Sequence, residues 1–310
     1  MYYYDIRIAS WVLSIAGGVL SIGVLGFAVR DLIRPAVHFK NISNAAAGNP
    51  YSNLRGPLKG VIIGLIFAIL RTVALIITLS GRVVFFELTY ITGFFNLCVH
   101  VIAFLSLVRV TRRFRSHISS KDSELGDDGA KIQAKPHSNK SLFDYAVIGM
   151  LGILGLTSWA FDLGNWLHIM YGKGYRQWYP KPTRDASKAL AIMNSVWLII
   201  TAIYISLRLL SKRRKAKMVG AGAGADAVTD IHARVTFTLK VIPTMAFVSV
   251  IRLISTFLQL FLQPRNFIEY TQSVGQADRA FQILNLIGAW IGEVLLLEFS
   301  RGALRRLARG

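Results

Sequence analysis

The chain has 310 residues, of which 53% are hydrophobic and 17% are charged, and its mean hydropathy is +0.46. This composition excludes an ordinary water-soluble globular protein and is typical of a helical membrane protein. The single cysteine, Cys98, excludes an internal disulfide and a cysteine-based metal site.

Apolar stretches long enough to cross a bilayer recur along the whole chain. A helix needs about 20 apolar residues to cross ~30 Å of hydrocarbon. The sequence therefore predicts an all-α bundle of seven transmembrane helices that forms a single polytopic domain over residues 1–310. The expected spans are residues 8–29, 60–80, 83–108, 145–169, 189–210, 235–262 and 280–300. The first stretch is longer than the apolar core of a usual cleaved signal, about 7–15 residues, which favours a retained anchor.

The basic residues are unevenly divided between the two predicted sides of the membrane. Loops 30–59, 109–141 and 208–234 and the C-terminal tail carry 24 of the 36 Lys and Arg residues, whereas the opposite side carries 9. The positive-inside rule then places the N-terminus outside or in the lumen and the C-terminus in the cytoplasm. The net charge of +20 is thus best explained by orientation and by the anionic cytoplasmic leaflet.

Nucleic acid binding is not expected, because no aromatic-basic platform or groove motif accompanies the positive charge. We expect an integral multi-pass protein of the endoplasmic reticulum or another endomembrane rather than of the plasma membrane. The oligomeric state is left open by the sequence.

Ionisable residues inside the early spans are the first candidates for function. Arg71 falls near the middle of the second span, and Glu87 falls in the lumenal half of the third. An intramembrane charge costs about 2.5–3.5 kcal/mol on insertion scales, so it is expected to face the bundle interior and to find a partner. His100, on another face of the third span, is expected to be a hydrogen-bonded buried residue. It has no second histidine at helical spacing that would indicate a metal site.

The fourth and fifth spans carry the clearest polar and aromatic stripes. Helical spacing places Asp162 in the lumenal half of the fourth span, between two indole rings. A carboxyl group in an apolar wall has a raised pKa and is a candidate proton donor. The residues that share these two stripes are Trp159, Asp162, Asn165 and Trp166 in the fourth span and Trp197 and Tyr204 in the fifth.

The last two spans add a second arginine and a third carboxylate. Arg252 lies near the middle of the sixth span, and Asn285 and Glu293 lie in the seventh. Arg71–Glu87 and Arg252–Glu293 are the expected ion pairs, either as structural links of the bundle or as parts of a site. Asp144 and Glu298 fall at span ends, where lipid headgroups are expected to solvate them.

Short segments of the second, sixth and seventh spans carry a resemblance. Phe67-Ala68-Ile69-Leu70-Arg71, Ile242-Pro243, Val250-Ile251-Arg252-Leu253 and Glu293 resemble segments of small fungal seven-span membrane proteins, a group that includes proteins of secondary-metabolite clusters. The membrane-bound meroterpenoid cyclases are similar in helix count. This resemblance implies an intramembrane acid, Asp162 or Glu87, that protonates a prenyl epoxide or olefin. It also implies that Trp159, Trp166, Trp197 and Tyr204 stabilise the resulting carbocation.

Two classes of function therefore stay open. One is a terpenoid cyclase or isomerase that acts on a lipid-like substrate without a metal or cofactor, because the paired Asp-rich motifs of membrane prenyltransferases are missing from the sequence. The other is a non-enzymatic receptor or exporter of a lipid or small molecule, whose Arg–Glu pairs are structural. Asn165, Arg71, Arg252, Asn285 and Glu293 are the predicted polar lining of the site in the first case.

Overall fold

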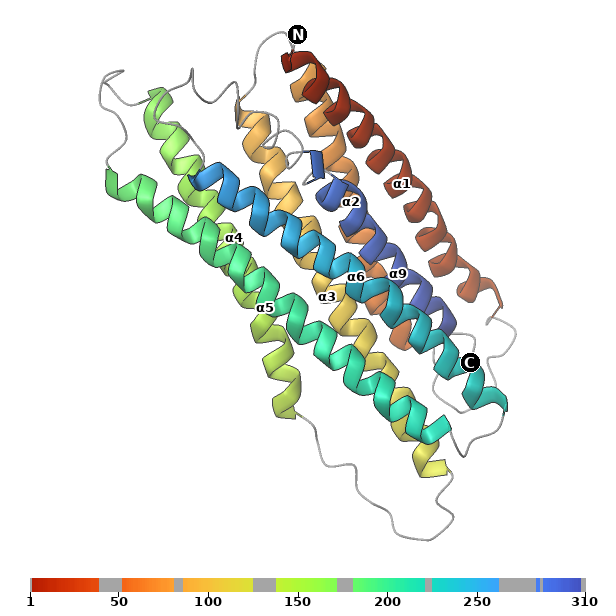
Figure 1. The fold of residues 1–310 in the computed structure, drawn as a ribbon. Coiled ribbons are helices and arrows are strands. Elements are labelled where there is room, and N and C mark those ends of the chain that lie inside the picture. Colours follow the sequence, from red (N-terminus) through yellow and green to blue (C-terminus); the bar gives the residue numbers. More distant parts are fainter. Residues whose placement is uncertain are drawn as a thin grey trace.

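The protein is a bundle of long helices, seen in a computed structural model of residues 1–310 (Figure 1). The structure describes residues 2–38, 52–80, 86–124, 138–171, 181–220, 225–261, 283–284 and 287–307. Six long helices come first along the chain: α1 (Tyr2–His38), α2 (Ser52–Ser80), α3 (Phe86–Glu124), α4 (Ser138–Tyr171), α5 (Lys181–Gly220) and α6 (Ala225–Phe261). A π-helical turn, η2 (Gly288–Gly292), then leads directly into α9 (Glu293–Leu307). No strand occurs among the described residues.

Six of these helices are long and apolar enough to cross a membrane. The apolar segments run over residues 11–33, 56–77, 90–112, 142–164, 189–211 and 235–254. Only helices and closed barrels satisfy every backbone hydrogen bond in lipid, which explains why each apolar run is helical. The chain is therefore an integral multi-pass membrane protein, and its predicted all-α class is confirmed for the residues that the structure describes.

The seventh predicted span differs from the other six. Its described part is helical at residues 283–284, contains the π-helical turn at Gly288–Gly292 and continues as the 15-residue α9. The helix extends to Leu307, beyond the predicted end of the span at residue 300. It packs against α1, α2, α3 and α6, so it is an inner helix of the bundle. Figure 1 shows the two chain ends towards opposite ends of the bundle.

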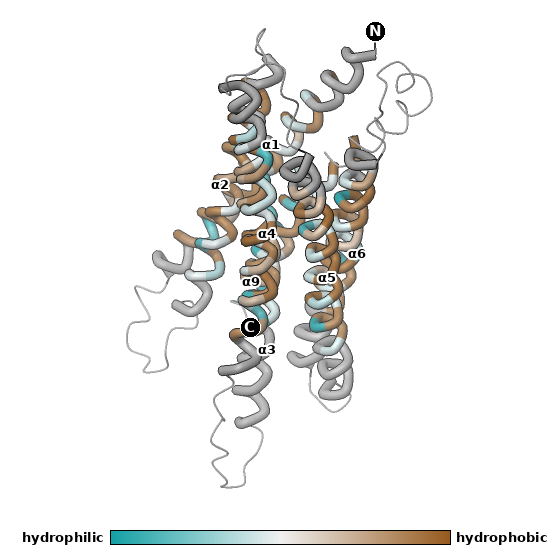
Figure 2. Tube along the Cα trace, turned by 90° about the vertical axis from the view of Figure 1, so that its left-hand side faces the viewer, coloured by the Kyte–Doolittle hydropathy of each residue, from teal (hydrophilic) through white to brown (hydrophobic). Residues whose placement is uncertain are grey.

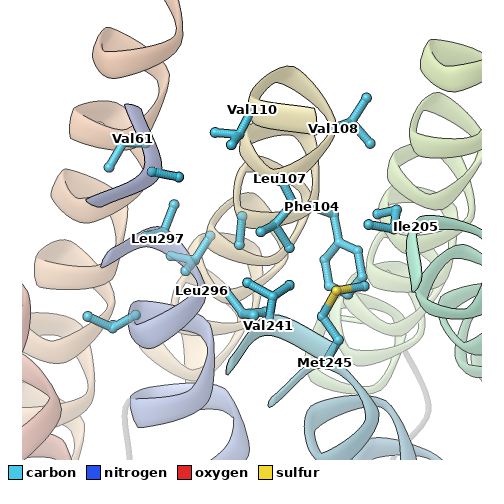
Figure 3. Close-up of a cluster of buried hydrophobic side chains, with 14 of the residues drawn as sticks. Val61, Phe104, Leu107, Val108, Val110, Ile205, Val241, Met245, Leu296 and Leu297 are labelled. Carbon is cyan, nitrogen blue, oxygen red and sulfur yellow. The ribbon is translucent and has the colours of Figure 1, made fainter. Parts of the chain in front are cut away.

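The apolar surface is divided between a core and an outer face. Side chains of α1 to α6 and of α9 meet in one buried cluster. Phe104, Met245 and Leu297 of this cluster are fully buried (Figure 3). Large apolar side chains such as Val19 on α1 are exposed instead. Figure 2 shows that hydrophobic residues predominate along the helices. An apolar exterior of this kind is stable only in contact with lipid.

Candidate functional site

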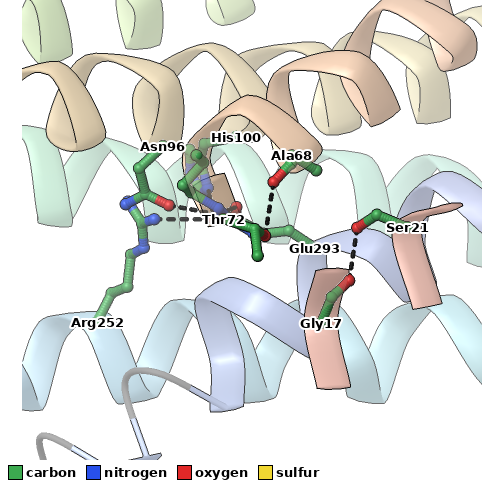
Figure 4. A network of polar contacts seen from close by, with 9 residues as sticks. Gly17, Ser21, Ala68, Thr72, Asn96, His100, Arg252 and Glu293 are labelled. Carbon is green, nitrogen blue, oxygen red and sulfur yellow. Dashed lines mark hydrogen bonds and ion pairs between the residues drawn. The ribbon is translucent and has the colours of Figure 1, made fainter. Parts of the chain in front are cut away.

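A carboxylate from the last helix lies at the centre of a buried polar network. Glu293, the first residue of α9, is fully buried and is approached from α2, α3 and α6. Arg71 Nη1 donates to Glu293 Oε2 at 3.0 Å, and Arg252 Nη2 donates to Oε1 at 2.8 Å. His100 Nδ1 lies 2.7 Å from the same Oε1 atom. Figure 4 shows Glu293, His100 and Arg252 lying between the helices. We call Glu293, Arg71, Arg252 and His100 the Glu293 network.

Arg71 is the most deeply buried cation of this network. Its side chain is 1% exposed, and its Nη1 also donates to Asn96 Oδ1 on α3 at 2.5 Å. The guanidinium carbon lies 4.2 Å from the ring centroid of Trp290 in the π-helical turn. A carboxylate, an amide oxygen and an aromatic face together offset much of the cost of burying this charge.

His100 joins the network through one ring nitrogen only. Its ring packs against Phe104 with a centroid distance of 4.9 Å, and Nδ1 contacts Glu293. The expectation of a hydrogen-bonded buried histidine is therefore confirmed. Nε2 is buried and makes no hydrogen bond to any residue that the structure describes, and the same is true of Ser249 Oγ, one turn before Arg252 on α6. Buried polar atoms of this kind ordinarily have a partner, so the site has unused hydrogen-bonding capacity.

The local backbone explains how Glu293 reaches partners on three helices. A π-helix widens the helix by one residue per turn and is found mostly as a single turn near functional sites. The η2 turn ends at Gly292, where a methyl group would lie 2.7 Å from Val248 Cγ2 of α6. The missing side chain at Gly292 thus lets α9 approach α6 closely, and this brings the Glu293 carboxylate within reach of Arg252.

The predicted pairing of the charges is confirmed for Arg252 with Glu293. Arg71, for which the sequence predicted Glu87, forms an ion pair with Glu293 as well. The Glu293 carboxylate thus forms ion pairs with both arginines. The surroundings of this ion pair also include Asn96, His100 and Trp290. The sequence pointed to the first two, because helical spacing places them on one face of the third span.

The predicted aromatic site around Asp162 does not form as one unit. Asp162 is exposed on the surface of the bundle, so the expectation that it faces the bundle interior is wrong. Trp159, one turn earlier, packs against Phe94 with a centroid distance of 5.2 Å, and its Nε1 donates to the Tyr90 carbonyl oxygen at 2.9 Å. The indole therefore packs against α3.

The two aromatic residues predicted on α5 lie near the other end of α4. Trp197 Nε1 donates to the Val147 carbonyl oxygen at 2.9 Å, and the Tyr204 hydroxyl donates to Asp144 Oδ1 at 2.5 Å. Residues 144 and 162 are separated by about 27 Å along a straight helix. Trp197 and Tyr204 consequently cannot line a common pocket with Asp162, because the α4 residues that they contact, Val147 and Asp144, lie more than about 20 Å from Asp162 along the helix.

Four other predicted site residues cannot be placed. The side chains of Glu87, Asn165 and Trp166 and the whole of Asn285 lie outside the described part of the chain. Their proposed roles stay predictions. No group of three or more His, Cys, Asp or Glu side chains that could hold a metal ion occurs among the residues that the structure does describe.

A second charged cluster, centred on Asp144, was not expected from the sequence. The Asp144 side chain is 2% exposed, so the prediction that headgroups solvate it is wrong. It accepts hydrogen bonds from Arg112 Nε at 2.9 Å and from the Tyr204 hydroxyl, and it forms an ion pair with Arg208. The cluster therefore ties together α3, α4 and α5 at the end of the bundle that carries the basic loops.

A third cluster ties α1 to α9 at that same end. Arg301 forms ion pairs with Asp31 and with Glu298, whose side chain is 29% exposed. The hydrogen bond from Arg301 to Glu298, with the charges of both acids, raises the pKa of Arg301 above its usual value against the opposing effect of burial. Glu298 is thus partly accessible, as expected, but it is also paired.

The chemistry of the Glu293 network follows from its contacts. Guanidinium groups contact both Glu293 oxygens, an arrangement that suits an ionised carboxylate and leaves no proton to donate. Among the described side chains, the network holds two guanidinium groups against one carboxylate, so it favours an anion over a cation. The Arg252 side chain is 19% exposed, against 1% for Arg71, which makes Arg252 the accessible cation of the pair.

In comparisons with known proteins, no family model, no curated protein and no solved structure matches this chain. What the fold and composition establish is its class, that of an integral multi-pass membrane protein with a buried ionic centre.

Proposed function

We propose that this protein binds a lipid-like small molecule with an acidic head group, without transforming it, and acts as a receptor or exporter in an endomembrane. The observation that carries the proposal is the sharing of Glu293 between Arg71 and Arg252. An acidic ligand near Arg252 would balance the positive charge of the network. An ionic pair inside a bilayer is strongly favoured over an isolated charge.

An unused hydroxyl group supports the same proposal. Ser249 Oγ is buried, makes no hydrogen bond to the described residues and lies one turn from Arg252. A carboxylate or phosphate has several acceptor positions and can use more donors than Arg252 alone supplies. The Ser249 hydroxyl and the Arg252 guanidinium would fix the orientation of the head group, while the ligand's hydrocarbon part remains among apolar side chains.

Photolabelling provides a direct test. The purified chain in phosphatidylcholine nanodiscs would be exposed to hexadecanoic acid that carries a diazirine and an alkyne, and in parallel to the corresponding hexadecanol. We expect the acid to label peptides of α6 near Arg252 at several times the level of the alcohol. Excess unlabelled hexadecanoic acid should compete with this labelling.

Arg252→Gln should abolish the preference for the acid, whereas Lys240→Gln should retain it. Lys240 is an exposed cation on the same helix, so it controls for the loss of one positive charge. Equal labelling by the acid and the alcohol, or an unchanged preference in the Arg252 variant, would refute the proposal.

A membrane-bound terpenoid cyclase of the meroterpenoid kind is the second candidate. The observation that favours it is the packing of Trp159 against Phe94, one turn from Asp162, which provides aromatic surface close to an acid. Microsomes that contain the chain would be supplied with epoxidised farnesyl-phenols. A cyclised product that is lost in Asp162→Asn would support this candidate, and the absence of turnover of any prenyl substrate would favour the receptor or exporter.

A further inference from the structure

The Asp144 cluster combines a buried carboxylate with two partly exposed cations. Asp144 is 2% exposed, while the side chains of Arg112 and Arg208 are 26% and 30% exposed. Arg112 lies on α3, Asp144 on α4 and Arg208 on α5, so the cluster spans three neighbouring helices. Among the described side chains that contact Asp144, two positive charges face one negative charge.

Each of the two guanidinium groups is also held against an aromatic ring. The guanidinium carbon of Arg112 lies 4.2 Å from the ring centroid of Tyr145, and that of Arg208 lies 5.0 Å from the centroid of Tyr204. A shared carboxylate and an aromatic face together fix the planes of both groups. Planar guanidinium groups with fixed orientation are well suited to bind phosphate through paired hydrogen bonds.

The surface around these charges is apolar. Leu142 is 76% exposed, Phe143 58% and Leu207 62%, and all three lie on α4 or α5 within one turn of a charged member of the cluster. A positive cluster beside exposed apolar side chains matches the boundary between headgroups and acyl chains. The basic loops at this end place that boundary in the cytoplasmic leaflet.

We propose that the Asp144 cluster is a binding site for the phosphate of an anionic phospholipid in the cytoplasmic leaflet. Arg112 and Arg208 bind the phosphate, and the acyl chains lie along the exposed apolar side chains of α4 and α5. Asp144 acts as a positioning residue, because it is too deeply buried to meet the lipid itself. This site is separate from the Glu293 network, so its test does not depend on the function proposed above.

Native mass spectrometry of the purified chain can test this site. The protein would be released from detergent micelles that contain equal amounts of phosphatidic acid and phosphatidylcholine, at a salt concentration that screens weak surface attraction. We expect the wild-type chain to retain one phosphatidic acid molecule in preference to phosphatidylcholine. Arg208→Gln should lower the affinity for that molecule by roughly tenfold or more, as expected for lost hydrogen bonds to a charged group.

Two further variants separate a specific site from general attraction. Arg208→Lys keeps the charge but loses the planar, stacked group, so it should lose most of the preference as well. Arg306→Gln removes an exposed cation from the same end of the bundle and should leave the preference intact. Thermal unfolding of each variant, measured alongside, shows whether the fold is retained.

Three results would overturn the proposal. One is an equal loss of preference in the Arg208 and Arg306 variants, which would mean that only total charge matters. Another is full preference in Arg208→Lys. The third is complete displacement of phosphatidic acid by soluble glycerol 3-phosphate, which would indicate a site for a free phosphate compound rather than for a lipid.

Discussion

Replacing Glu293 by glutamine tests whether the buried network holds the bundle together. The substitution preserves the shape of the side chain but removes the negative charge between Arg71 and Arg252. Glu293 is 0% exposed and Arg71 1%. Water therefore cannot replace the partner that the Arg71 guanidinium loses. Breaking a buried pair in this way typically costs about 3–5 kcal/mol. We expect the unfolding temperature in mild detergent to fall by on the order of 10 °C.

The same helix offers a matched control. Glu298→Gln is the same chemical change about one and a half turns further along α9. There the carboxylate is 29% exposed and paired with Arg301. A partly exposed pair contributes about 1 kcal/mol or less, so this variant should unfold close to the wild-type temperature. Arg71→Gln combined with Glu293→Gln should recover part of the loss, because the double change also removes the most deeply buried cation.

Unfolding temperature is best followed by size-exclusion chromatography of heated samples, since it reports loss of the folded particle directly. The reasoning would be refuted if Glu293→Gln and Glu298→Gln unfolded at the same temperature. It would also be refuted if the double variant were no more stable than Glu293→Gln alone, because the buried guanidinium would then carry no penalty.

Three further predictions concern packing, the second cluster and orientation. Gly292→Ala should destabilise the protein by about 1–3 kcal/mol in a thermal assay, because the new methyl group meets Val248, whereas Gly302→Ala meets nothing within 4 Å and should be neutral. Tyr204→Phe should cost about 1.5–3 kcal/mol in the same assay through its lost hydrogen bond to Asp144, and a wild-type unfolding temperature would contradict that bond. After removal of the native cysteine, single cysteines would be placed near each chain end, and an impermeant maleimide should modify them from opposite sides of the membrane. Modification of both cysteines from the same side would contradict an odd number of membrane crossings.

The membrane class and the positions of most helices could be predicted because both depend on local features of the chain. The length of an apolar run and the backbone hydrogen bonds that it must satisfy in lipid require no knowledge of its neighbours. The last helix was less predictable. Its π-helical turn at Gly288–Gly292 packs closely against α6, and an apolar stretch by itself contains no information on that packing.

Which buried charges meet was decided by the tertiary structure. Intramembrane position and helical spacing singled out Arg71, Arg252 and Glu293, because a charge in lipid must find a partner wherever it lies. The rotation of each helix about its axis, and the identity of its neighbours, brought both arginines to Glu293 and left Asp162 exposed. Those rotations result from packing across the whole bundle, in which one small residue such as Gly292 sets how closely two helices approach.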